Sequence, residues 1–292
     1  MYSRILVVTG DQPWEDAPVE YAIALAADTG AELSILTVLL LPLIAGMPDV
    51  MACTLVVESA MAQSAVVLAQ AAAAAEQAGV SYTTRVRWGN PADVILRTAE
   101  EEDCDLIIVG SHACTWRSRR LLRHVIKKLT SSARQPLLVI TEPPEEASRW
   151  RSWARLLVVH DGSPGGEAAV HYALALAQEA ALDVYMLHSQ TLMQPHETAP
   201  HRGARSVQDL LTLVAAQTAI AGVSYNEVLA LGRTVTAIME TAADRACDVI
   251  ILGVEQHSGW KRLLYEHTAK AVMANTTLPV LPVNRLATTV TH

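Results

Sequence analysis

The hydrophobic pattern of the chain alternates between short, continuous apolar runs and longer segments with helical spacing. In the first half, four apolar runs predict strands that are buried on both faces, and one alternating run predicts a strand that is less completely buried. These five predicted strands are Ile5–Thr9, Leu33–Leu39, Tyr82–Arg87, Leu106–Val109 and Leu137–Ile140. Continuous apolar runs are typical of parallel sheets, so the pattern already favours an α/β fold.

Segments with helical spacing fill the intervals between these strands. Gly30 and Gly79 are suited to end two of the helices, and Asn90 followed by Pro91 is suited to begin another. The four predicted helices are Ala17–Thr29, Glu58–Ala78, Pro91–Glu102 and Arg119–Ala133. Regular alternation of strands and helices predicts a parallel sheet with helices on both faces, and such sheets bind ligands beyond the carboxyl ends of their strands.

The same order of elements occurs twice along the chain. Short sequences of the first half recur in the second half at an offset of 143, or of 151 near the start of each half. The recurring pairs are Ala78–Tyr82 with Ala221–Tyr225, Cys104–Gly110 with Cys247–Gly253, and Ile5–Val8 with Leu156–Val159. The difference between the offsets, 151 minus 143, places about eight extra residues in the first half, around Leu41–Val56. We therefore predict a tandem duplication, with domains at 1–142 and 154–285 and a polar, proline-bearing linker at 143–153.

Composition narrows the class of protein further. The 292 residues are 51% apolar and 18% charged and include no Phe, which predicts globular domains with aliphatic cores. The formal net charge of -8 argues against general nucleic-acid binding and against attraction to an anionic membrane surface. The start of the chain shows no signal peptide, and the most apolar stretch, Leu33–Met47, contains Pro42 and is too short to span a membrane. We expect a cytoplasmic protein that binds neither membrane nor nucleic acid.

Sequence motifs for metal binding and catalysis are missing. The four cysteines form no CxxC pair, which favours buried thiols in a reducing compartment over zinc or redox chemistry. The phosphate-binding, nucleophile-elbow and zinc-protease motifs GxGxxG, GxxxxGK[ST], GxSxG and HExxH do not occur. We therefore predict no metal site and no catalytic residue.

One candidate binding residue follows the first strand of the second half, where the chain reads Asp161-Gly162-Ser163-Pro164. A carboxylate at the end of the first parallel strand is placed to hydrogen-bond a ribose or a base. The alternative is that these residues form only the turn into the next helix. In the first half the acid, Asp11, is displaced by one position, which re-aims its side chain.

Taken together, these motifs resemble the universal stress protein family. The resemblance rests on the Asp-Gly-Ser sequence of the second half, on Asp105–Gly110 and Asp248–Gly253, on Ser258–Leu264, and on the final proline-plus-apolar strand. It covers about Tyr2–Ile140 and Ala154–Val283. The family implies two doubly wound, five-stranded parallel-sheet domains that pair through their last strands. We therefore expect the two halves to form a pseudo-dimer within one chain, with a further homodimer left open.

Some members of this family bind ATP through Gly-x-x-Gly, nine residues, and then Gly-Ser or Gly-Thr, because glycines let backbone N–H groups approach phosphate. This sequence departs from the pattern in both halves. Gln256 and Ala113 replace the second glycine, and Glu266-His267 and Arg123-His124 replace the final pair. The resemblance carries a candidate adenine-nucleotide pocket, for ATP or AMP, onto Asp161, Gly162, Gly253, Gly259 and His267 in the second domain, and onto Gly110, Arg123 and His124 in the first.

The function that we expect is a non-enzymatic binding or regulatory module of the stress response, with a degenerate ATP-binding motif. One alternative is an adenine-nucleotide-binding protein that retains one altered site in the second domain, and another is a slow nucleotide hydrolase. The basic run Arg117–Lys128 adds a further choice, between a site for an anion or an acidic protein partner and an ordinary solvated helix face.

Overall fold

The computed structural model describes most of the chain, in two compact units, Tyr2–Ser152 and Trp153–His292. The described residues are 2–10, 17–40, 50–111, 116–141, 153–160, 163–189, 225–230, 234–254 and 262–284, with single positions at 212, 215, 223 and 286. The description of helices at 50–53, 116–121 and 262–267 extends to the backbone only. Each unit is considered by itself below.

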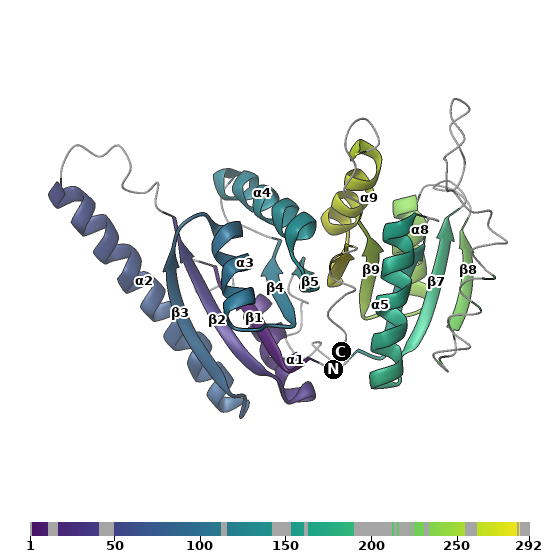
Figure 1. Cartoon of the computed structure of the whole chain (residues 1–292), viewed down its shortest axis with the longest axis horizontal. Helices are drawn as coiled ribbons and strands as arrows, with labels where there is room; N and C mark the ends of the chain where they lie inside the picture. The colour runs from purple at the N-terminus through teal and green to yellow at the C-terminus, as the bar shows by residue number, and fades with distance from the viewer. Residues whose placement is uncertain are drawn as a thin grey trace. The chain divides into compact units, whose positions relative to one another are not determined.

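The first unit is a five-stranded parallel sheet with helices on both faces (Figure 1). Its strands lie in the order β3-β2-β1-β4-β5. The chain therefore adds strands on one side of β1 first and then, from β4, on the other side. Helices α3 and α4 pack together on one face, while α1 and α2 cover the other (Figure 1). The elements are β1 (Arg4–Val8), α1 (Ala17–Thr29), β2 (Glu32–Leu39), α2 (Val50–Gln77), β3 (Tyr82–Trp88), α3 (Pro91–Glu101), β4 (Leu106–Gly110), α4 (Trp116–Ser132) and β5 (Leu137–Ile140).

The second unit repeats this architecture, with its parallel strands in the order β8-β7-β6-β9-β10. Its register is also the same, because Arg155 lies opposite Asp183 as Arg4 lies opposite Glu32. The elements are β6 (Arg155–His160), α5 (Pro164–Ala180), β7 (Asp183–Ser189), β8 (Tyr225–Ala230), α8 (Thr234–Asp244), β9 (Val249–Gly253), α9 (Arg262–Asn275) and β10 (Val280–Val283). The predicted fold class, two tandem doubly wound parallel-sheet domains, is confirmed.

Aliphatic side chains of the central strands form the core of each unit. Ile5, Leu6 and Ile107 are fully buried in the first unit, and Leu157 and Ile250 are fully buried in the second. Full burial of such a side chain contributes roughly 1.5–3 kcal/mol, so these strands hold the sheet in place by the hydrophobic effect. The prediction of aliphatic cores is confirmed, because the largest fully buried side chains are Ile and Leu.

The predicted helix boundaries hold where capping residues set them. Asn90 caps α3, accepting a hydrogen bond from the Ala92 N–H at 3.2 Å, and Pro91 is the first helical residue. Gly30 follows α1 with φ +73°, a conformation that glycine adopts at little cost. Two starts were predicted too late: α4 begins at Trp116 instead of Arg119, and α2 begins at Val50 instead of Glu58. No proline or glycine interrupts 50–58, so the helix continues through an apolar segment that has no clear period.

Helix α2 is also the one described helix that is long and apolar enough to cross a membrane, over Thr54–Gln77. Only 22% of its most apolar window is buried, and Leu55, Met61 and Val66 are exposed. The helix meets this criterion by length and composition only, and the buried core helix of a soluble protein can meet it as well.

Candidate functional site

Two buried imidazoles lie at the carboxyl edge of the second unit, where its ligand site is predicted. His160 is the last residue of β6, and His188 lies directly opposite on β7. Both are fully buried, and their rings meet edge to face with centroids 5.6 Å apart. The strand register therefore places two imidazole rings together, near the point where the order of the strands in the sheet reverses.

Burial keeps His188 neutral near pH 7. Desolvation lowers the pKa of His188, and the nearby carboxylate of Glu227 on β8 only partly opposes this effect. Neither ring nitrogen of His188 has a hydrogen-bond partner within the described part of the chain. A neutral imidazole can accept one hydrogen bond and donate another, so this edge of the sheet offers polar capacity that the described side chains leave unused.

The corresponding edge of the first unit carries hydroxyl groups. Thr9 and Thr37 are both buried, and their hydroxyl oxygens lie 2.9 Å apart. Thr9 also donates to the carbonyl oxygen of Gly10 at 3.0 Å, so its single proton is used and Thr37 is the donor within the pair. The Thr37 hydroxyl thus has a hydrogen-bond partner, whereas the ring nitrogens of His188 have none within the described part of the chain.

The fourth strand of each unit ends in a glycine, Gly110 or Gly253, that has a packing role. A Cβ atom on Gly253 would lie 2.2 Å from the carbonyl carbon of Gly165 and 2.3 Å from the nitrogen of Gly166, in the first turn of α5. A Cβ on Gly110 would lie 3.0 Å from the Pro18 Cγ atom in the first turn of α1. Both glycines thus admit the start of a helix against the sheet, and this packing alone requires a residue without a side chain at Gly253.

The helix that packs on Gly253 begins with a well-formed cap. The Ser163 hydroxyl accepts a hydrogen bond from the Gly166 N–H at 3.0 Å, and Pro164 occupies the first helical position. The positive end of the α5 dipole therefore lies beside the carboxyl end of β9, where an anionic group is favoured.

Backbone amides that follow the two fourth strands are already engaged. The Ser111 N–H donates to the Ile140 carbonyl at 2.8 Å, and the Val254 N–H donates to the Val283 carbonyl at 2.8 Å. These two donors extend the sheet to the fifth strand of each unit, which leaves them unavailable to a phosphate group.

The predicted nucleotide-binding residues divide into three groups. Gly110 and Gly253 lie at strand ends as described above, and Arg123 and His124 are exposed on α4. His267 belongs to α9, but its side chain is outside the described part. Asp161, Gly162 and Gly259 lie outside the described residues altogether. The assignment of a nucleotide to any of these residues stays a prediction.

The basic run on α4 is partly neutralised by its neighbour. Lys128 forms an ion pair with Asp93 of α3, and Arg123 and His124 remain exposed on the helix surface. The side chains of Arg117–Leu121 lie outside the described part, so the choice between a partner site and a solvated face stays open.

Metal and thiol chemistry find no support among the described residues. No group of three or more His, Cys, Asp or Glu in this part of the chain is arranged to hold a metal ion. Cys104 and Cys247 are buried at equivalent positions, and burial raises the pKa of each thiol to about 12. Thiols with such a pKa are protonated and inert at neutral pH, as expected of structural cysteines.

The histidine pair is the feature that the sequence patterns did not reveal. The offset of 151 aligns Thr9 with His160 and Thr37 with His188, but only the strand register shows that each pair shares one face. The histidine pair can be found from sequence by aligning the first two strands of each half at the offset of 151.

Comparison with known proteins agrees with the fold. The model of the universal stress protein family matches residues 1–141 and again residues 152–284. A universal stress protein of Methanocaldococcus jannaschii is 27% identical over 146 residues, which cover 50% of this chain and 86% of that protein. A solved universal stress protein from Archaeoglobus fulgidus aligns with a TM-score of 0.72 and 18% identity over 97% of this chain and 96% of its own. One from Pseudomonas aeruginosa, also 18% identical, gives 0.58 over 97% and 93%.

Proposed function

This chain belongs to the universal stress protein family, and from that premise we propose that it is a tandem stress-response protein acting as a binding or regulatory module and not as an enzyme. The proposal includes a nucleotide motif that no longer holds a triphosphate in the manner the family pattern implies. Family membership and the duplicated domain are the premises, while the molecular activity is the proposed part.

The observation that carries this proposal is how the fourth strands end. Gly253 and Gly110 already pack against the first turns of α5 and α1, and the amides of Ser111 and Val254 already pair with the fifth strands. A phosphate cradle needs backbone N–H groups that point at the ligand. The described parts of both loops commit these groups to the fold, which supports a binding role other than ordinary ATP handling.

A second candidate function is adenine-nucleotide binding in the second unit alone. The capped amino end of α5 lies against Gly253, directly after the segment that contains Asp161. This arrangement favours a ligand with one phosphate over a ligand with three, because one helix end offers few donors.

A test of both begins with the purified full chain. Denaturing the protein and identifying the released small molecules by mass spectrometry, followed by calorimetry with ATP and AMP, measures occupancy directly. Absence of both nucleotides, with no heat of binding, is expected of the repurposed module. Binding near one nucleotide per chain that Asp161→Ala abolishes, and that Asp11→Ala leaves intact, would establish the second candidate instead.

Metal-dependent hydrolysis that survives purification and is lost in Asp161→Ala would overturn the non-enzymatic proposal.

We further propose that the two units pair with each other within the chain, as the family resemblance implies, in the cytoplasm. A self-paired chain needs no second copy. Light scattering on the eluting full chain is expected to give the monomer mass of 31.5 kDa. A dimer that persists on dilution would contradict this expectation.

A further inference from the structure

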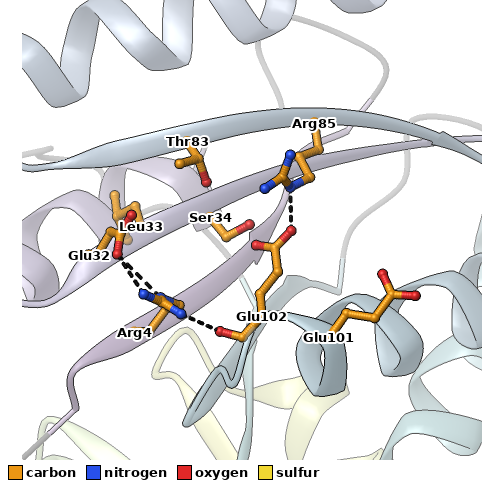
Figure 2. Close-up of a pocket in the computed structure, with 8 residues that line it drawn as sticks. All are labelled: Arg4, Glu32, Leu33, Ser34, Thr83, Arg85, Glu101 and Glu102. Carbon is orange, nitrogen blue, oxygen red and sulfur yellow. Dashed lines mark hydrogen bonds and ion pairs between the residues drawn. The ribbon is translucent and has the colours of Figure 1, made fainter.

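A hollow opens at the amino edge of the first unit, at the end of the sheet opposite the predicted nucleotide site. Its volume is about 260 Å³, and its walls come from the starts of β1, β2 and β3 and from the end of α3 (Figure 2). Cavities that hold drug-sized ligands measure roughly 300–1,000 Å³, so this hollow fits a smaller molecule.

A buried hydroxyl without a partner forms part of this hollow. Ser34 is 1% exposed, and its hydroxyl oxygen makes no hydrogen bond within the described part of the chain. It lies between Arg4 and Arg85, and Thr83 faces it from the neighbouring strand (Figure 2). An unsatisfied buried hydroxyl is unfavourable, so a ligand that bonds to it recovers free energy that the fold alone gives up.

Charged groups of both signs surround this hydroxyl. Arg4 donates twice to one oxygen of Glu32, at 3.0 and 3.3 Å, and once to the Glu102 carbonyl at 2.6 Å. The Arg85 Nε group donates to the Glu102 carboxylate. The terminal nitrogens of Arg85 and the second oxygen of Glu32 have no further partner among the described residues. The hollow thus keeps donors at one side and an acceptor at the other.

The second unit carries different side chains at the positions that line this hollow in the first. The strand register places Tyr185 where the first unit has Ser34, and Val228 where it has Arg85. Arg245 follows α8 as Glu102 follows α3, and its guanidinium lies over the Tyr185 ring, 5.8 Å from the centroid. An aromatic ring and an apolar side chain therefore replace the hydroxyl and the guanidinium.

We propose that the amino-edge hollow of the first unit binds a small zwitterion, namely a free α-amino acid. Its carboxylate accepts hydrogen bonds from the terminal nitrogens of Arg85 and from the hydroxyls of Ser34 and Thr83, and its ammonium group donates to Glu32. Guanidinium groups suit carboxylates because they donate two parallel bonds. A simple anion would face the three carboxylates that line the hollow, while a simple amine would not bond to the Ser34 hydroxyl or to the terminal nitrogens of Arg85.

The test is calorimetry on the full chain with glycine, alanine, serine, glutamate and lysine, each at millimolar concentration. Acetate, methylamine and inorganic phosphate serve as probes that carry one charge only. We expect at least one amino acid to bind and the single-charge probes to bind at least tenfold more weakly. Equal binding of acetate or phosphate, equal binding of methylamine, or no binding by any amino acid would each overturn the proposal.

Two variants locate the binding. Ser34→Ala removes the unsatisfied hydroxyl, so we expect at least tenfold weaker amino-acid binding with an unchanged or higher thermal midpoint. Ser34→Tyr copies Tyr185 of the second unit and is expected to abolish binding. Ser59→Ala, an exposed serine on α2, is the matched control. Thr83→Val gives a second measurement should a Ser34 variant fail to fold, with the same loss expected. Wild-type affinity in Ser34→Ala, or in a folded Thr83→Val together with Ser34→Tyr, would refute this placement.

Discussion

The two units share a backbone framework and differ in the side chains at both edges of their sheets. In the first, the Asp105 carboxylate accepts hydrogen bonds from the Ser3 and Arg4 amides, and in the second, Asp248 accepts from the Ala154 and Arg155 amides. These bonds tie the start of each first strand to the start of each fourth strand. The repeat has therefore kept the contacts that define its topology.

The two units differ in the side chains at the carboxyl edge and at the amino edge of the sheet. At the carboxyl edge, the hydroxyl pair Thr9–Thr37 of the first unit corresponds to the imidazole pair His160–His188 of the second. At the amino edge, a hollow beside Ser34 corresponds to a filled position at Tyr185. The first unit thus carries hydroxyl groups at both edges of its sheet, whereas the second carries imidazoles at one edge and an aromatic ring at the other. The comparison teaches that a single function assigned to both halves would be wrong for at least one of them.

The largest expected effect is the difference in stability between alanine substitutions at Gly253 and at Gly110. Gly253→Ala places a Cβ within 2.3 Å of backbone atoms of α5, which cannot rotate away, whereas Gly110→Ala meets only the Pro18 side chain at 3.0 Å. Overpacking typically costs 1–3 kcal/mol, so we expect a loss of about 3 kcal/mol for Gly253→Ala and about 1 kcal/mol for Gly110→Ala. Hydrogen exchange read by mass spectrometry reports the opening free energy of each unit separately. Equal losses in the two units would break the comparison.

The imidazole pair predicts that acid weakens the second unit. Because the pKa of His188 is lowered in the fold, the unfolded chain takes up a proton first as the pH falls below about 6.5, which favours unfolding. The loss accumulates at up to about 1.4 kcal/mol per pH unit until the folded imidazole also titrates. Between pH 7.5 and 5.5 we expect the second unit to lose about 1 kcal/mol, measured by hydrogen exchange corrected for the intrinsic rates at each pH.

A matched variant comes from the chain itself. The double substitution His160→Thr with His188→Thr copies the hydroxyl pair of the first unit, and we expect it to remove most of this acid sensitivity. Glu227 is retained in both proteins, so its own titration cancels from the difference. An acid-induced loss as large in the double variant as in the wild type would assign the effect to other groups.

The sequence allowed most of the fold to be predicted because the fold depends on local and periodic signals. The apolar runs become the buried strands, and the cap at Asn90 and the glycine at Gly30 mark helix ends where they were expected. The start of α2 could not be placed, because an apolar segment without a break or a clear period gives no boundary signal.

The sites were harder to predict because they depend on register. His160 and His188 are 28 residues apart, the same separation as Thr9 and Thr37, and only pairing of the strands brings each pair together. The hollow at Ser34 likewise requires three strands and the end of a helix. The family resemblance predicts Gly110 and Gly253 as ligand residues, and the structure adds a packing role that no spacing rule could reveal.

The smallest expected effect concerns the ion pair at the amino edge. The Glu32 carboxylate raises the pKa of Arg4 through a hydrogen bond and its charge, but both side chains are about two-fifths exposed, at 41% and 39%. Exposed ion pairs contribute roughly 0.2–1 kcal/mol and are screened by salt, so Glu32→Gln should destabilise the first unit by about 0.5 kcal/mol in low salt and by less in 1 M salt. Denaturant unfolding at the two salt concentrations measures this difference, with Glu20→Gln, an exposed acid on α1, as the control. A salt-independent loss would show that Glu32 acts through packing and not through charge.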